Sequence, residues 1–209
     1  MIKLTEQFPN SIKIGEKNYA INTDYRIMAN LETKISRADI SDANKFAEIF
    51  RETISALFIE IPNEDIREII KGVLLYYCCG KEPSPKKSEG GSKRCYDNDE
   101  DSYYLFAAFM QQYGDDLITS HMHWWEFRAK FTALTEETEF VKIMQYRSIN
   151  ISKIKNKEER ARIKKLQERF ALKSQKPKKF ADVESRDEAM KQKLQKRFEE
   201  VQKQAGGNK

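Results

Sequence analysis

The sequence predicts a mainly α fold: a multi-helix bundle with a short N-terminal β-hairpin and a charged helical C-terminal extension. Apolar residues recur at i, i+3, i+4 and i+7 through most of the chain, which is the pattern of amphipathic helices. Only eight of the 209 residues are glycine and five are proline, so few positions interrupt those helices. Charged residues make up 34% and hydrophobic residues 39%, a balance that favours a soluble helical protein.

The hairpin is predicted in the stretch SIKIGEKNYAIN, residues 11–22. Apolar and polar residues alternate on both sides of Gly15 to Asn18, which is the period of half-buried strands around a tight turn. We expect this hairpin to be the only sheet.

Three helices are expected between the hairpin and Gly80. Asp24 is placed to cap the first, the second begins at Ser41 and is broken by Pro62 and Asn63, and the third ends at Gly80. Their apolar faces comprise Met28, Leu31 and Ile35 in the first, Phe46, Ile49, Phe50, Leu57 and Phe58 in the second, and Ile66, Ile69, Ile70, Val73, Leu74 and Tyr77 in the third.

A polar stretch, KEPSPKKSEGGSKR, follows the third helix. It is rich in Pro, Ser, Gly and Lys and cannot supply a packed face, which predicts a mobile linker over residues 81–95. Helices over about residues 100–113, 116–134 and 137–147 then complete the bundle.

The acidic run DNDED, Asp97 to Asp101, resembles the start of a calcium-binding loop. The loop pattern needs glycine at position six and glutamate at position twelve, where this chain has Ser102 and Ala108. Capping of a helix N-terminus, where carboxylates favour the positive end of the dipole, is the better interpretation.

The stretch HMHWWEFRAKF, residues 121–131, raises the question of a metal site. On a helix His121 and His123 would lie roughly 200° apart, so one metal ion could not take both. Trp124 and Trp125 would fall on two apolar sides of a central helix, which favours core packing over a ligand pocket.

The apolar stripe narrows after Ile151. Residues Ile154, Ile163, Leu166 and Phe170, and then, beyond Pro177, Val183, Met190, Leu194, Phe198 and Val201, form a seam flanked by charged residues. Such a seam fits either a helix that seeks a partner or a charged surface helix on the bundle. We therefore divide the chain into a domain of residues 1–172 and an extension of residues 173–209, with Met190, Leu194, Phe198 and Val201 as candidate partner-binding residues.

Charge is unevenly distributed along the chain. Residues 97–139 hold 2 basic and 10 acidic side chains, whereas residues 140–209 hold 21 basic and 9 acidic ones. The asymmetry indicates either an interaction tail or attraction between an acidic core and a basic extension.

Several classes of protein find no support in the sequence. No apolar run approaches 18 residues and the N-terminus MIKLTEQFPN has no hydrophobic signal region, so we expect neither membrane insertion nor export. The odd count of three cysteines, without C-x-x-C spacing, indicates a reduced cytosolic chain. Phosphate-binding, hydrolase and metalloprotease motifs do not occur, and the adjacent Asp115 and Asp116 make a poor catalytic pair. We expect a non-enzymatic protein without cofactor or metal.

Three segments together resemble the family of long-tailed phage proteins known as gene product fifteen. They are FPNSIKIGEKNYAINTDYR, YDNDEDSYYLFAAFMQQYGDDL and HMHWWEFRAKFTAL with KIMQYRSINI, and the resemblance covers about residues 8–172. The matching positions are Asp24, Arg26, Asp101, Ala108, Phe109, Tyr113, Trp124, Trp125, Phe127 and Arg147. The chain departs from the pattern at Asp115, where an apolar residue is expected.

The resemblance implies a role in tail morphogenesis, because genes of this family lie between those for the major tail protein and the tape measure protein. It carries no catalytic residues. We therefore expect a tail assembly chaperone in the host bacterial cytoplasm that shields the apolar helices of the tape measure protein. The major tail protein is a further candidate partner, and a homo-oligomer remains open.

The alternative is a nucleic-acid-binding phage protein that uses the basic C-terminal helices to neutralise phosphates. Acidic residues at helical pairing distances and the lack of interleaved surface aromatics weigh against it.

Overall fold

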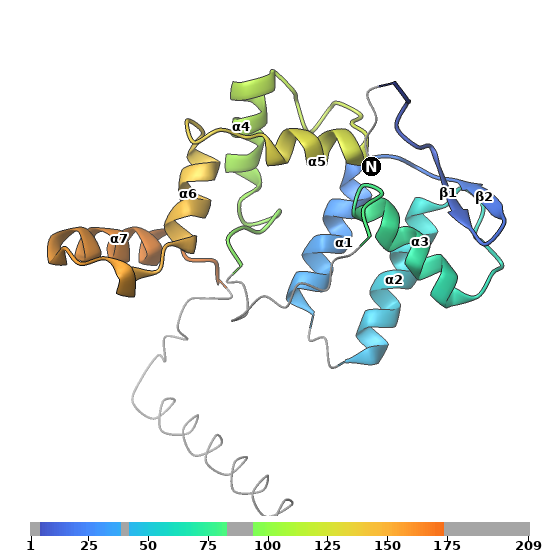
Figure 1. The fold of residues 1–209 in the computed structure, drawn as a ribbon, viewed down its shortest axis with the longest axis horizontal. Helices are drawn as coiled ribbons and strands as arrows, with labels where there is room; N and C mark the ends of the chain where they lie inside the picture. The colour runs from blue at the N-terminus through green and yellow to red at the C-terminus, as the bar shows by residue number, and fades with distance from the viewer. Residues whose placement is uncertain (1–4, 39–41, 83–93, 174–209) are drawn as a thin grey trace, which may run out of the picture. The chain divides into compact units, whose positions relative to one another are not determined.

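The computed structural model describes residues 5–38, 42–82 and 94–173 (Figure 1). These residues form a two-stranded hairpin, seven α-helices and one 3-10 turn, which confirms the predicted mainly α fold with an N-terminal hairpin. Most of the predicted linker, residues 81–95, lies outside the described residues. So does the predicted extension apart from Lys173, including Met190, Leu194, Phe198 and Val201.

The hairpin consists of β1 (Ser11–Ile14) and β2 (Lys17–Ala20), paired antiparallel from Ser11 with Ala20 to Ile14 with Lys17. The turn holds only two residues, and Gly15 adopts a φ of 59°, a left-handed conformation that glycine reaches without steric cost. Within the described residues this is the one sheet, as predicted.

The hairpin packs on α3 (Ile66–Tyr77) through its buried face. Ile12 and Ile14 are buried, and a Cβ added to Gly72 would lie 2.9 Å from Ile12 Cγ2 and 3.3 Å from Ile14 Cγ1. The bare backbone of α3 at this glycine therefore lets the strand approach closely.

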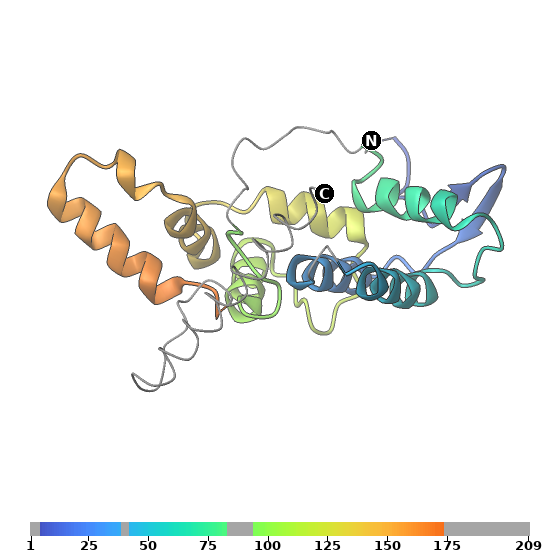
Figure 2. The same cartoon turned by 90° about the horizontal axis from the view of Figure 1, so that it is seen from below.

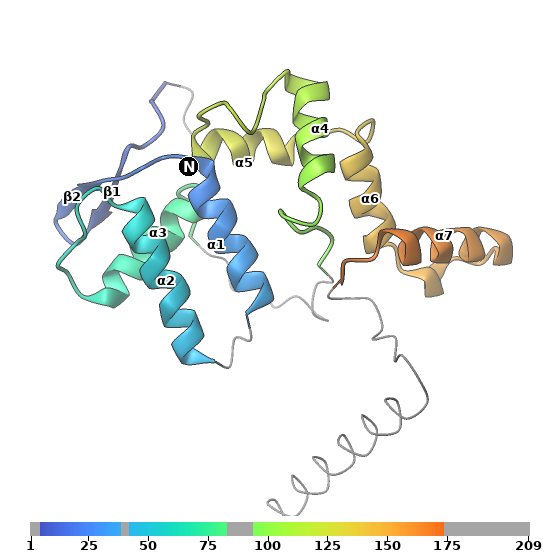
Figure 3. The same ribbon diagram turned by 180° about the vertical axis from the view of Figure 1, so that it is seen from behind.

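Aspartate side chains cap the first three helices. Asp24 accepts from the Arg26 backbone N–H at the start of α1 (Tyr25–Arg37), as predicted. The predicted start of α2 (Ala43–Leu57) at Ser41 is wrong by two residues, because the carboxylate of Asp42 caps it. Asp65 caps α3, and α1 and α2 lie side by side (Figures 1 and 3).

Four helices follow: α4 (Ser102–Tyr113), α5 (Trp124–Thr132), α6 (Glu139–Ser148) and α7 (Lys157–Phe170). A 3-10 turn, η1 (Ile151–Lys153), precedes α7, which packs beside α6 (Figure 2). The expected helix over residues 116–134 is wrong in its first half. Asp116 instead folds its carboxylate onto the backbone N–H groups of Ile118 and Thr119, and this local turn competes with helix formation.

One hydrophobic cluster joins residues from the hairpin through α6. Its largest fully buried side chains include Met28 and Leu31 of α1, Phe109 of α4 and Trp124 of α5. Phe127 stacks on Tyr25 and on Phe109, at centroid distances of 4.5 and 5.2 Å, so α5 ties α1 to α4.

Candidate functional site

The two tryptophans of α5 complete the C-terminal end of α3. The last carbonyl groups of a helix lack intrahelical partners. The indole N–H of Trp124 donates to the Tyr77 carbonyl oxygen at 3.0 Å, and that of Trp125 donates to the Tyr76 carbonyl oxygen at 2.9 Å. Trp124 also stacks on the Tyr77 ring at 5.5 Å. The tryptophan pair thus fixes α5 to α3.

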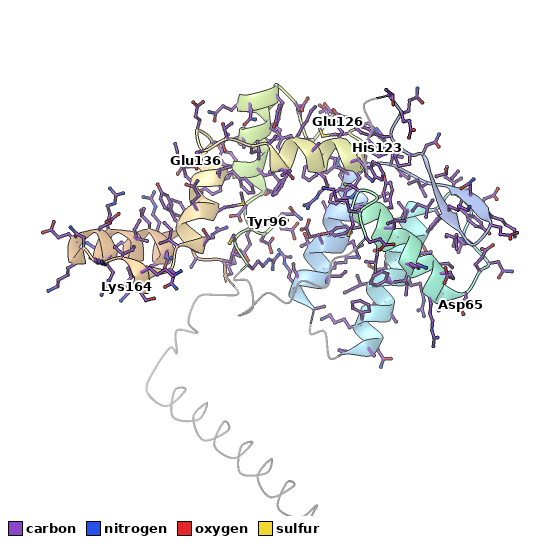
Figure 4. All side chains as sticks on the ribbon, viewed as in Figure 1. Asp65, Tyr96, His123, Glu126, Glu136 and Lys164 are labelled. Carbon is purple, nitrogen blue, oxygen red and sulfur yellow. The ribbon has the colours of Figure 1, made fainter. Side chains whose placement is uncertain are left out.

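His123 precedes α5 rather than lying within it, so the predicted placement of both histidines on one helix is wrong (Figure 4). Its Nδ1 accepts from the Trp125 backbone N–H at 2.9 Å, and its Nε2 lies 3.0 Å from the Pro9 carbonyl oxygen. The neutral tautomer with hydrogen on Nε2 satisfies both contacts. Burial lowers the pKa of His123, which favours that neutral form.

Arg26 holds the loop that leads into α5. Its Nη2 donates to the carbonyl oxygens of Leu117, Ile118 and Ser120 at 2.8, 2.7 and 3.2 Å. Its Nη1 donates to Asp24 at 2.7 Å, and this carboxylate also caps α1. Asp24 and Arg26 therefore act together, and the sequence showed only the cap.

Backbone contacts reinforce that attachment. The Trp124 backbone N–H donates to the Thr23 carbonyl oxygen at 2.9 Å, and the Tyr25 backbone N–H donates to the Met122 carbonyl oxygen at 3.0 Å. The segment before α5 is thus held by the start of α1, which gives a tertiary reason for its extended conformation.

Arg147 of α6 collects four acceptors from separate parts of the chain. Its guanidinium binds both carboxylate oxygens of Asp101, at 2.5 and 2.8 Å, and the carbonyl oxygens of Cys95 and Phe170, at 2.9 and 2.6 Å. Asp101 stands at the N-cap position of α4 but forms no side-chain cap, so the predicted capping role is wrong for this residue. It is the buried counter-ion of Arg147 instead.

Asp97 caps the turn that precedes α4, so the predicted capping of the helix itself by the acidic run is wrong. Its carboxylate accepts from the backbone N–H groups of Asp99 and Glu100 at 2.9 and 3.0 Å, and it pairs with Arg37 and Arg94. Burial alone would favour the neutral acid, but these hydrogen bonds lower the pKa of Asp97 below its usual value. Arg94 belongs to this cluster although the sequence placed it in the linker.

Phe109 and Tyr113 bind α4 to α5. Phe109 is fully buried and stacks on Phe127, while the Tyr113 hydroxyl donates to the Lys130 carbonyl oxygen at 2.8 Å. Asp115, the residue that departs from the family pattern, lies 2.7 Å from Lys130 Nζ. The acidic residue is accommodated by this ion pair.

Tyr96 lies at the centre of a polar and aromatic cluster between α1 and α5 (Figure 4). Its hydroxyl donates to Glu32 at 2.5 Å, and its ring packs on Phe131 at 5.1 Å. Burial raises the pKa of Tyr96, and the negative charge of Glu32 raises it further. The hydroxyl therefore acts as a hydrogen-bond donor that joins the two helices.

The described surface includes two large open grooves. One, of about 790 Å³, lies between α1 and α4 and is bordered by Tyr103 and Ile118. The other, of about 660 Å³, lies between α2 and α3 and is bordered by Ile61 and Ile66. Neither groove could be predicted from the sequence, because Ile66 follows the apolar period of α3 and yet is 54% exposed, and Ile61 and Ile118 lie outside the helices.

The described residues place no group of three or more histidine, cysteine, aspartate or glutamate side chains where they could hold a metal ion. Over the same residues, no helix is long and apolar enough to span a membrane. The candidate partner-binding residues Met190, Leu194, Phe198 and Val201 stay predictions, since they lie outside the described residues.

Comparison with known proteins gives one match. A family model described as Bacteriophage Gp15 protein matches residues 4–172. Neither the curated proteins nor the solved structures contain a match to the chain.

Proposed function

The chain belongs to the Bacteriophage Gp15 protein family and is a phage protein, and we propose that it is a tail assembly chaperone. In this proposal it binds the tape measure protein in the cytoplasm of the host cell and shields its helices until tail subunits polymerise around them. The protein then acts by binding alone, without a catalytic step.

The observation that carries the proposal is apolar surface left open between helices. Ile59, Ile61, Ile66 and Ile118 are each more than half exposed, and three of them border the two grooves. Contiguous exposed apolar surface marks sites of protein interaction in soluble proteins. Amphipathic helices laid in apolar grooves are a recurrent mode of such recognition.

The rigid frame around the grooves also supports the proposal. The buried ion pair of Arg147 and Asp101 joins α6 to α4, the tryptophans join α5 to α3, and Arg26 of α1 binds the loop before α5. A preorganised surface loses less conformational freedom on binding than one that must first fold.

Co-expression with the tape measure protein of the same phage tests the proposal. We expect the full-length tape measure protein to stay in the soluble fraction and to be captured by the tagged chaperone at both low and high salt. Arg147→Met, which disrupts the frame, serves as the inactive control. Equal aggregation of the tape measure protein with and without the chain would contradict the proposal.

The same co-expressed protein distinguishes the chaperone function from the nucleic-acid-binding alternative. Phosphate binding by basic residues weakens steeply as salt rises. Tight DNA binding that disappears between low and high salt, without capture of the tape measure protein, would replace the chaperone by the alternative function.

A further inference from the structure

The groove between α2 and α3 is built like a receptor for one more helix. Its walls are helical: α2 packs against α1 on one side and α3 packs against the hairpin on the other. Ile54 of α2 and Ile69 of α3 are buried at its floor. Helices pack at interaxial distances of about 8–10 Å with side chains interdigitating, so a helix laid here would complete a local bundle.

The rim of this groove is aliphatic and open. Ile61 and Ile66 line it and are 64% and 54% exposed. They flank Pro62 and the Asp65 cap, which hold the rim in place at the start of α3. Leaving two large aliphatic side chains exposed beside an apolar floor has no benefit for the isolated chain.

Two opposite charges mark the groove. Glu64 lines it in ionised form, since hydrogen bonds from the Tyr19 hydroxyl and Lys17 lower the pKa of Glu64. Its second oxygen, Oε2, is buried and accepts no hydrogen bond from any described residue. Buried carboxylate oxygens are normally paired, so this one lacks a donor.

Arg51 supplies the other charge. It lines the groove from α2 and is exposed, and its guanidinium forms no ion pair with the residues that the structure describes. The groove thus offers an apolar floor with one cation, Arg51, that is open to an outside partner, whereas Glu64 is already held by Tyr19 and Lys17.

We propose that this groove binds one amphipathic α-helix of a partner protein. Aliphatic side chains at i, i+3 or i+4 and i+7 fill the floor, and an aspartate or glutamate pairs with Arg51. Helix-in-groove recognition uses this spacing of anchors, and the cation on the rim favours a helix with an acidic residue beside its apolar face. The inference deepens the proposed function and takes the partner, a tape measure helix, from it.

The test uses the full chain and fluorescence anisotropy with two labelled probes. The first is a designed 20-residue amphipathic peptide that carries leucines at helical spacing and one glutamate beside them. The second is a set of overlapping peptides that tile the tape measure protein of the same phage. Ile61→Ser with Ile66→Ser should weaken binding by about tenfold or more, the scale of lost anchor residues. Ile59→Ser is the matched control, since Ile59 is 71% exposed but does not line the groove.

Arg51 gives a second variant that leaves the core intact. Arg51→Glu should weaken binding of the glutamate-bearing peptide. A peptide in which lysine replaces that glutamate should bind the Arg51→Glu variant again. Such a reciprocal exchange reports a direct charge pair rather than a change in folding.

The outcomes separate the groove from the chaperone proposal. If the groove binds the designed peptide but no tape measure peptide, the groove is a helix-binding site whose partner is not the tape measure protein. If the variants at Ile61, Ile66 and Arg51 capture the tape measure protein as well as the wild type does, the chaperone function is supported and the groove is excluded as its binding site. If neither probe binds, the proposal is wrong. It is also wrong if the wild type sediments as a dimer and the Ile61→Ser with Ile66→Ser variant as a monomer, because a second copy of the chain would then occupy the groove.

Discussion

Arg147 and Asp101 form an ion pair that is closed to water. The two bonds measure 2.5 Å from Nη1 to Oδ2 and 2.8 Å from Nη2 to Oδ1, and the side chains are 5% and 3% exposed. The pair joins α6 to the start of α4, and the same guanidinium also binds the C-terminal end of α7 through the Phe170 carbonyl oxygen.

Breaking this pair on one side should destabilise the fold strongly, because the remaining charge stays buried without a partner. We expect Arg147→Met to lower the free energy of unfolding by about 3–5 kcal/mol in urea titrations. The double variant with Asp101→Leu should lose less than the sum of the single variants. Lys164→Met, in an exposed pair with Glu168 at 4.0 Å, is the control and should leave the midpoint unchanged. Strictly additive losses would show that the pair is not coupled.

The tryptophans of α5 should be structural through both their size and their N–H groups. Trp124→Ala removes a fully buried side chain and should cost about 3–5 kcal/mol of unfolding free energy. Trp125→Phe keeps a ring but removes one of the two donors to the Tyr76 carbonyl oxygen, which retains the Cys79 backbone N–H, so it should cost about 0.5–1.5 kcal/mol. Thermal and urea denaturation measure both, with the exposed Tyr103→Phe as control. An unchanged midpoint for both tryptophan variants would remove this role.

Stability should depend on the protonation of His123. Burial lowers its pKa in the folded state below 6.5, so the unfolded chain binds the proton more readily. The contribution is therefore fully present above pH 6.5 and is lost as pH falls through the lowered folded value. Urea titrations at a series of pH values measure this loss.

His123→Asn separates the proton from the cap. Asparagine caps helices well but does not titrate in this range, so this variant should show a flatter dependence of unfolding free energy on pH. His121→Asn is the comparison, since His121 is exposed and its charge lowers the pKa of His123 less than burial does, so this variant should change the pH dependence less than His123→Asn. A His123→Asn variant that follows the wild-type pH curve would rule out His123 as the source.

Residues 1–172 should fold without residues 173–209. Leu172 is 1% exposed and the hydrophobic cluster lies before it, so the truncated chain should melt cooperatively at the wild-type midpoint, as a domain with its own core does. Calorimetry on both chains measures this. A broad or strongly lowered transition would mean that the core needs the C-terminal residues.

The candidate partner-binding residues of the extension can be tested independently of the groove. Replacing Met190, Leu194 and Phe198 together by serine should weaken capture of the tape measure protein while leaving every Lys and Arg in place. Full capture by this variant would exclude the seam as a binding surface. Capture reduced only by loss of Lys164, Lys165, Lys178 and Lys179, and only at low salt, would favour nucleic acid.

Sequence patterns were sufficient where structure is local. The period of Met28 and Leu31 identified α1, the spacing of Ile69 and Val73 identified α3, and Asp24 was recognised as a cap because its acceptor bonds a backbone N–H two residues away. Turn chemistry at Gly15 likewise placed the hairpin. In each case the deciding interactions lie within one or two helical turns.

Sequence patterns failed where a competing contact comes from elsewhere in the chain. The apolar spacing of Leu117 with Trp124 suggested a continuous helix, but Arg26 and Thr23 hold residues 117–124 in another conformation. The sequence also predicted that the acidic run caps a helix, whereas Asp97 caps the turn before α4 and Asp101 pairs with a guanidinium 46 positions away.

The sequence by itself determined most of the helical segments, where the hairpin turns and which family the chain resembles, because periodicity and turn residues act over a few neighbouring positions. Only the tertiary structure decided that Trp124 and Trp125 close the end of α3, that Arg147 neutralises Asp101, and that a groove bordered by Ile61 and Ile66 stays open. Those outcomes depend on which helices pack against one another. The free energy of burying an N–H, a charge or a methyl group depends on the partners that the neighbouring helices supply.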